Sequence, residues 1–505
     1  MIWKLRGDSR PQQPALPADD EEPLLNPDEE SPRSSQEELA TKPTRKSQEK
    51  STWVRTTIIT VLLAAVTVCS LGAVICLVGS HTFFAPRRPA QREHHPMEDF
   101  PIKNIVVLVQ ENLAFDTIAG GLTYNPDIDG LVNRTFCNPA DVSNANTSPL
   151  VCANPIAKNV ATDDPDHSIT GGNQQVYGTD HPDPEMHRPN MQGFVTEQIR
   201  AHGLGSDLMR AAEVINYYPP EHVPVFNALA ENYLLFDRWF AAVPGPTNPN
   251  RAYLTSGTSR GHGHNDRGFD VSALPQLSIF EQLSAANISW INYSNTTGFA
   301  PDAMFYQWTV RSGHSRTSIK PIDRFYQDAR AGTLPRFTWI NPECCSYMSF
   351  HPPSPINMGE GFVKSIYEAV RSSPQWNETL FILTFDEHGG FADHVPPPEN
   401  VPPGDSYAYT EVARDGKSAT FHFDRLGIRV PTILISPWVE RGVVEHAPTT
   451  QRGEYTHTSI LKFVAELWDL DILTPRVAWS PSFAGLITRS YRDDTPELLP
   501  APADF

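Results

Sequence analysis

The clearest pattern along this chain is a series of short apolar runs separated by segments with helical spacing. Runs rich in apolar, β-branched and aromatic residues predict strands at 102–109, 288–293, 337–340, 380–385 and 430–436. Between them, apolar positions three and four residues apart predict helices at 223–232, 279–286, 361–371 and 459–467. Strands that alternate with amphipathic helices predict an α/β fold, with a mostly parallel sheet flanked by helices.

The N-terminal part of the chain has a different pattern. Residues 1–55 are rich in Pro, Glu, Ser and Arg and nearly free of aromatic residues, which predicts a disordered tail. Residues 56–80 carry no charged side chain and are long enough to cross a bilayer as one helix, which predicts a transmembrane signal anchor. A polar stalk at 81–100 would join this helix to a folded domain at 101–505.

Basic residues and glycosylation sequons indicate how the predicted anchor is oriented. Five basic residues lie close before the helix and three lie close after it. Six sequons follow the helix and none precedes it: Asn133, Asn146, Asn287, Asn292, Asn295 and Asn377. We therefore expect a single-pass type II membrane protein with a lumenal or extracellular C-terminal domain. Leu24-Leu25 after acidic residues resembles a vacuolar or endosomal sorting signal, although such short matches are common in disordered tails.

Composition narrows the range of partners. The formal net charge of the 505 residues is -19, which argues against nucleic acid as the main partner and against adhesion to anionic membranes by charge alone. Four cysteines lie after the predicted anchor, at positions 137, 152, 344 and 345. They allow three pairings, among which the sequence does not choose.

Two of the predicted strands run directly into oxygen-donor side chains. The strand at 380–385 is followed by Asp386-Glu387-His388, and the strand at 102–109 leads to Glu111-Asn112. Because the carboxyl ends of parallel strands meet at one edge of a sheet, these residues could together bind a hard divalent cation such as Ca²⁺ or Mg²⁺. Each pair alone could instead be a cap or a solvated acidic turn.

A third segment, PGPTNPNR at 244–251, places Thr247 at the start of a predicted helix. The free backbone N–H groups of a helix N-terminus favour an anion. With Arg251 one turn further on, the hydroxyl suits attack on a phosphate or sulfate; the alternative is that Thr247 only caps the helix. His351 and His394, which lie in loops near the acidic segments, are candidates for proton transfer at neutral pH.

These segments resemble a known family. The chain is similar to the phosphoesterase family, which contains non-specific phospholipases C and some bacterial acid phosphatases, in five stretches: IKNIVVLVQENLAFD, FDRWFAAVPGPTNPNR, SPQWNETLFILTFDEHGGFADHV, FDRLGIRVPTILISPWVERG and EYTHTSIL. They follow the family's order from about residue 101 to about residue 485. The resemblance implies an alkaline-phosphatase-like α/β fold.

The resemblance also implies roles for single residues. The family's metal ligands fall on Glu111, Asn112, Asp386 and Glu387, and its hydroxyl nucleophile, which also contacts the metal, falls on Thr247. The histidine that protonates the leaving group falls on His351. The implied reaction is attack by the threonine on a phosphodiester, departure of diacylglycerol and release of the phosphorylated head group by water. We therefore expect a membrane-anchored phospholipase C acting on glycerophospholipids.

Two departures from the family pattern leave other functions open. Leu113-Ala114 stands where the family usually has Arg-Ser, and Phe350 precedes His351 where an aspartate is common. Neither change removes a predicted ligand or the nucleophile. The alternatives are an acid phosphatase for phosphomonoesters, which would share the catalytic residues, and a non-catalytic lumenal binding protein of the same fold.

Overall fold

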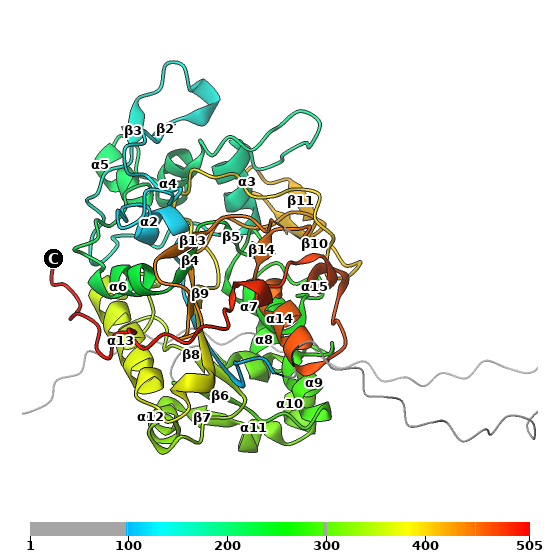
Figure 1. Ribbon diagram of the computed structural model, residues 1–505. Coiled ribbons are helices and arrows are strands. Elements are labelled where there is room, and N and C mark those ends of the chain that lie inside the picture. Colours follow the sequence, from blue (N-terminus) through cyan, green and yellow to red (C-terminus); the bar gives the residue numbers. More distant parts are fainter. Residues whose placement is uncertain (1–96, 98, 296–299, 450) are drawn as a thin grey trace, which may run out of the picture. The chain divides into compact units, whose positions relative to one another are not determined.

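The central element of the fold is an eight-stranded sheet (Figure 1). In the computed structural model, which describes residues 97, 99–295, 300–449 and 451–505, the strand order is β13-β4-β12-β9-β1-β8-β6-β7. From edge to edge, these strands are Val443–Glu445, Leu234–Phe236, Thr432–Ile435, Thr379–Phe385, Asn104–Gln110, Phe337–Asn341, Trp290–Ser294 and Ile319–Pro321. β12 is antiparallel to both of its neighbours, and every other pairing in the sheet is parallel. The predicted α/β fold with a mostly parallel sheet is therefore confirmed.

Helices cover both faces of this sheet (Figure 1). One layer holds α6 (Pro224–Asn232), α12 (Ile322–Ala331) and α13 (Ile356–Arg371), and the other holds α7 (Thr247–Ser256), α9 (Ile279–Ala285) and α14 (Thr458–Trp468). Every residue of β1 and β9 is buried as a result. Burial on both faces explains why these strands read as continuous apolar runs instead of alternating ones.

Shorter elements lie around the two helical layers. The remaining helices are α2 (Phe115–Ala119), α3 (Ile169–Tyr177), α4 (Phe194–His202), α5 (Leu208–Ala211), α8 (Arg267–Asp270), α10 (Gln307–Arg311), α11 (His314–Thr317) and α15 (Pro475–Trp479). The remaining strands form three two-stranded sheets: β2 (Cys137–Pro139) with β3 (Leu150–Cys152), β5 (Trp239–Phe240) with β14 (Tyr455–Thr456), and β10 (Tyr409–Val412) with β11 (Ser418–Phe421).

Two disulfides settle the cysteine pairing. Cys137 bonds to Cys152 across the β2–β3 pair, and Cys344 bonds to Cys345 in the segment after β8. The predicted tail and anchor lie outside the described residues, as does nearly all of the predicted stalk. Within the ranges that are described, no helix combines the length and apolar composition needed to span a membrane.

Candidate functional site

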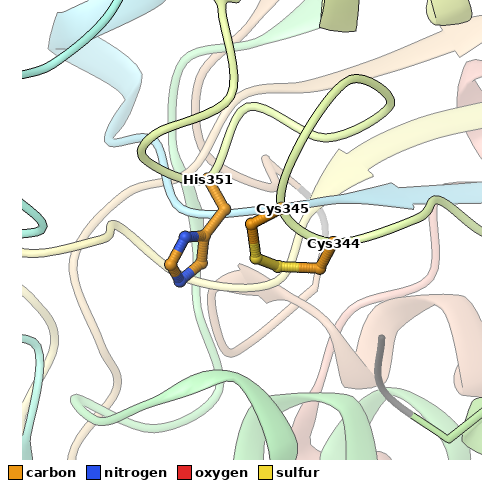
Figure 2. A group of neighbouring side chains, drawn as sticks. All are labelled: Cys344, Cys345 and His351. Atoms are coloured by element: carbon orange, nitrogen blue, oxygen red, sulfur yellow. A yellow bond between two sulfur atoms is a disulfide. The ribbon is translucent and has the colours of Figure 1, made fainter. Parts of the chain in front are cut away.

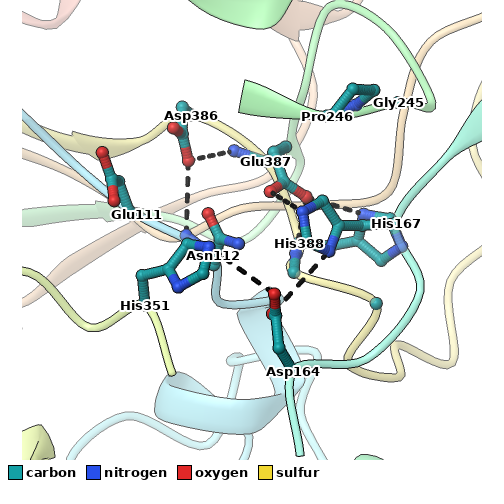
Figure 3. A network of polar contacts seen from close by, with 12 residues as sticks. Glu111, Asn112, Asp164, His167, Gly245, Pro246, His351, Asp386, Glu387 and His388 are labelled. Atoms are coloured by element: carbon teal, nitrogen blue, oxygen red, sulfur yellow. Dashed lines mark hydrogen bonds and ion pairs between the residues drawn. The ribbon is translucent and has the colours of Figure 1, made fainter. Parts of the chain in front are cut away.

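The first two site segments meet where neighbouring strands end. β1 and β9 are parallel, and their last residues pair with each other, so Glu111-Asn112 and Asp386-Glu387 leave the sheet at the same level. The Asn112 backbone N–H donates to Asp386 Oδ1 over 3.3 Å, and the Glu387 backbone N–H donates to the same oxygen over 2.8 Å. The structure thus brings together the residues predicted to hold a cation (Figure 3), and their role as ligands stays a prediction.

Arg251 lies inside this cluster. From α7, its guanidinium donates to Asp386 Oδ2 over 3.0 Å, to Glu111 Oε1 over 3.1 Å and to Asp302 Oδ2 over 3.4 Å. The side chain is only 3% exposed. Its Nη2 also donates to the carbonyl oxygen of Val109 over 3.2 Å. The buried donors are thus engaged by carboxylates and backbone, and a role for Arg251 beside the substrate phosphate stays a prediction. Arg251 offsets the negative charge of the acidic residues and orients them. Arginine suits this role in a buried site because its guanidinium presents several donors in a fixed planar geometry.

Burial is the largest single influence on the pKa of each of these carboxylates. It raises the pKa of Glu111 to about 8 and the pKa of Asp386 to about 7, although Arg251 acts in the opposite direction. Burial also acts to raise the pKa of Glu387, but the positive charge of His167 outweighs it with help from local hydrogen bonds, and that pKa is lowered. One arginine therefore does not neutralise the whole cluster, and a further cation would favour the ionised carboxylates.

The cluster also has oxygen atoms available for such a cation. Asn112 Oδ1 and Glu387 Oε1 are buried and have no hydrogen-bond partner among the described residues. Arg251 engages Oε1 of Glu111, so Oε2 of that side chain is left for another ligand. Carboxylate and amide oxygens are the donors that Ca²⁺ and Mg²⁺ prefer. The residues present therefore fit the divalent ion that the family resemblance implies.

Thr247 begins the helix that carries Arg251. Pro246, in extended conformation, is the N-cap of α7, and the Asn248 backbone N–H in the first turn donates to Asn265 Oδ1 over 2.8 Å. Thr247 is the first helical residue and not the N-cap, so the alternative that it serves as an ordinary cap is wrong. Asn250 holds the preceding turn by donating to the carbonyl oxygens of Val243 and Gly245 over 3.1 and 2.9 Å. Thr247 lies one helical turn before Arg251, on the same face of the helix. Figure 3 shows the Gly245–Pro246 segment beside Glu387.

The long insertion at 133–190 supplies two site residues that the sequence interpretation missed, Asp164 and His167. His351 Nε2 lies 3.8 Å from Asp164 Oδ2, while its Nδ1 is held 2.5 Å from the carbonyl oxygen of Pro352. Asp164 therefore provides a carboxylate near His351, while Phe350, the residue before this histidine, packs against Phe385. The spacing Asp-Pro-Asp-His in a Pro-rich insertion was the available signal for these residues.

His167 is the charged neighbour of Glu387. Its Nδ1 lies 2.7 Å from the carbonyl oxygen of Pro165, and its Nε2 lies 3.8 Å from Glu387 Oε1. Burial acts to lower the pKa of His167, but Glu387 and Asp164 outweigh it and raise the pKa to about 9. In Figure 3, dashed lines join Glu387 to His167 and His388, and join Asp164 to His167 and His351.

His394 lies in another network, against the expectation of a catalytic role. Its Nδ1 is 2.6 Å from Asp116 Oδ2, and its Nε2 is 3.2 Å from Asp129 Oδ1. Arg429 bridges Asp116 and Asp393 in the same buried group. Because carboxylates engage both ring nitrogens, neither is left to protonate a leaving group, and we assign His394 to the structure of this loop.

The two substituted family positions also have a structural explanation. Leu113 is 1% exposed and Ala114 is fully buried, and both belong to the hydrophobic core. Ala114 is the N-cap of α2 and makes no side-chain capping bond there. The loss of the family's Arg-Ser thus exchanges polar side chains for core packing and leaves the neighbouring Glu111-Asn112 in place.

Comparisons with known proteins point to one family. The sequence model of the phosphoesterase family matches residues 102–471. Non-specific phospholipase C4 of Arabidopsis thaliana is 38% identical over 426 residues, which cover 80% of this chain and 75% of the relative. Phospholipase C B of Mycobacterium tuberculosis is 27% identical over 440 residues, 78% of either chain. A solved structure from the alkaline phosphatase superfamily of Vibrio parahaemolyticus aligns at 11% identity with a TM-score of 0.31, over 51% of this chain and 63% of that chain. So low a score carries no argument, and the alkaline-phosphatase-like relation stays a prediction.

Proposed function

The chain belongs to the phosphoesterase family of phosphoric ester hydrolases, and on that premise we propose that it is a phospholipase C. It hydrolyses the phosphodiester of glycerophospholipids to diacylglycerol and a phosphorylated head group. The observation that carries the proposal is the convergence of the β1 and β9 carboxylates around Arg251, with Thr247 one turn away on α7. The relatives named as non-specific phospholipases C, at 36–38% identity, support the same substrate class.

The reaction assigns each group a task. The Thr247 hydroxyl gives its proton to water as it attacks phosphorus, the bond to the glycerol oxygen breaks, and the head group stays on the threonine as a phosphodiester. His351 gives its proton to the departing diacylglycerol alkoxide, and Asp164 keeps its ring oriented. Water then hydrolyses the threonine ester.

A divalent ion held by Glu111, Asn112, Asp386, Glu387 and Thr247 would neutralise charge on the phosphate oxygens and lower the pKa of the attacking hydroxyl. His167, cationic at neutral pH, faces Glu387 at the border of this group and adds positive charge where the phosphate would bind. Arg251 favours the ionised forms of Glu111 and Asp386 and holds one oxygen of each in position.

We further propose that the enzyme is a single-pass type II membrane protein with its catalytic domain in a lumenal or extracellular space. Support comes from the uncharged segment at 56–80 and from sequons found only after it. Of these sequons, Asn133, Asn146, Asn287 and Asn377 are exposed. The dileucine at Leu24-Leu25 supports sorting to vacuoles or endosomes.

The test compares diacylglycerol release from phosphatidylcholine by the full-length wild type and by two threonine variants. Thr247→Ala should abolish turnover, whereas Thr247→Ser, which keeps a hydroxyl, should retain part of it. Equal rates for wild type and Thr247→Ala would contradict the assignment of the nucleophile. A phosphomonoester such as p-nitrophenyl phosphate belongs in the same assay, because faster cleavage of the monoester would identify an acid phosphatase. No turnover of any ester would identify a non-catalytic binding protein.

A further inference from the structure

Two cysteines and a histidine gather beside the carboxylate cluster. Cys344 and Cys345 form a disulfide in the segment between β8 and α13, and His351 follows in the same segment. Their sulfur atoms and one imidazole nitrogen lie within 4.8 Å of one another. Figure 2 shows the ring of His351 next to the disulfide. All three side chains are partly exposed, so a small solute can reach them.

The disulfide also touches the proposed cation site. Cys345 Sγ lies 4.0 Å from Glu111 Oε2, the oxygen that Arg251 does not engage. A disulfide sulfur carries no proton, so the pair makes only a van der Waals contact while the S–S bond is intact. A free thiol or thiolate at the same place would be a donor or a metal ligand directly beside this carboxylate.

The turn that carries the cysteines is held by other bonds as well. Glu343, 4% exposed, accepts the backbone N–H groups of Ser346 and Tyr347 over 3.4 and 3.1 Å. These bonds do not depend on the disulfide. We therefore expect the two sulfur atoms to stay near His351 when the S–S bond is broken.

We propose that reduction of the Cys344–Cys345 disulfide creates a binding site for a thiophilic divalent cation of the Zn²⁺ class, with Cys344, Cys345 and His351 as ligands. Glu111 Oε2, 4.0 Å from Cys345 Sγ, would complete a four-coordinate set. Thiolate and imidazole ligands favour Zn²⁺, whereas the neighbouring oxygen cluster favours Ca²⁺ or Mg²⁺. With the disulfide intact, the oxygen cluster offers ligands for a cation. With the disulfide reduced, the two thiolates and His351 offer a second set of ligands that favours Zn²⁺.

The chemistry balances with a dithiol as the reductant. The dithiol transfers two electrons and two protons to the S–S bond, which breaks into two thiols, and the dithiol itself becomes a disulfide. Binding of the cation then releases both thiol protons to water. Occupancy would also withdraw His351 from proton donation and slow hydrolysis; this last consequence rests on the proposed function, and the site itself does not.

The test uses Co²⁺ as a spectroscopic probe on the full-length protein. A phosphine reduces the disulfide, with water supplying the oxygen of the phosphine oxide, and is removed before anaerobic titration. The reduced wild type should show a thiolate-to-cobalt charge-transfer band that Zn²⁺ displaces and Ca²⁺ does not. The oxidised wild type should lack the band, although it can still bind Co²⁺ through oxygen ligands. Reduced protein without the band would overturn the proposal.

Variants assign the band to this cluster. Cys344→Ser/Cys345→Ser retains the Cys137–Cys152 pair, so a band in this variant would come from the other cysteines and overturn the assignment. His351→Asn should weaken Co²⁺ binding by about tenfold or more, and unchanged affinity would contradict its place as a ligand. Hydrolysis is measured on the same samples: a Zn²⁺-sensitive band with undiminished turnover would support the site and contradict only the role of His351 as the acid.

Discussion

The buried charge of Arg251 gives the sharpest stability prediction. Arg251→Met keeps most of the volume and removes the cation that contacts Asp386, Glu111 and Asp302 at 3.0, 3.1 and 3.4 Å. All of these side chains are nearly inaccessible to solvent, so water cannot replace the guanidinium. Removing one partner from a buried ion cluster typically costs about 3–5 kcal/mol. We expect the free energy of unfolding of the metal-free protein to fall by about that amount.

Urea unfolding followed by tryptophan fluorescence, with a chelator present, measures this loss. Lys462→Met is the matched control, because its pair with Glu466 lies on the surface of α14 at 3.8 Å and such pairs contribute about 1 kcal/mol or less. Added Ca²⁺ or Mg²⁺ should restore part of the stability of Arg251→Met, since a divalent ion replaces the missing positive charge. A loss no larger than that of Lys462→Met would refute the reasoning about charge balance in the cluster.

Three further outcomes are expected. Asn112→Ala and Glu387→Gln should each weaken divalent-metal binding by about tenfold or more, as measured by equilibrium dialysis. The first removes a buried amide oxygen that has no hydrogen-bond partner among the described residues, and the second removes the negative charge of a buried carboxylate; unchanged affinity would place the ion elsewhere. Although burial opposes it, Asp116 and Asp129 raise the pKa of His394 to about 9 from 6.5. Its contribution to stability, at most about 3 kcal/mol, is therefore complete below pH 6.5 and is lost as the pH rises through about 9. His394→Gln should flatten the stability profile over this range. In a glycosylating host, glycopeptide mass spectrometry should find glycan on exposed Asn133 but none on Asn292, which is fully buried in β6 and donates to Asn341; a glycan there would contradict the fold.

Long buried strands and long helices could be predicted because their patterns are strong. The strand at 380–385 differs from β9 by one residue, and the helix at 459–467 differs from α14 by one residue at each end. The helix expected at 361–371 starts instead at Ile356, directly after the N-cap Pro355. Short strands such as β4, with three residues, carry too little pattern to be recognised before their neighbours are known.

The site residues that directly follow a buried strand could be predicted from the sequence. Glu111-Asn112 and Asp386-Glu387 met as expected because β1 and β9 are parallel neighbours. The Asp-Pro-Asp-His spacing marks Asp164 and His167 as unusual, but their place in the site was missed because they reach it from an irregular insertion whose path no local pattern determines. Arg251 was expected beside the substrate, and its true partners appear only when three segments distant in sequence come together around it.

The central claim is that Thr247 carries the head group during turnover. The direct measurement is mass spectrometry of the peptide containing Thr247 after rapid acid quenching of the full-length enzyme with phosphatidylcholine. We predict a phosphocholine adduct on Thr247 that forms as diacylglycerol appears, and that is absent from wild type without substrate and from Thr247→Ala with substrate. Diacylglycerol release with the adduct on another residue, or at the wild-type rate in Thr247→Ala, would contradict it.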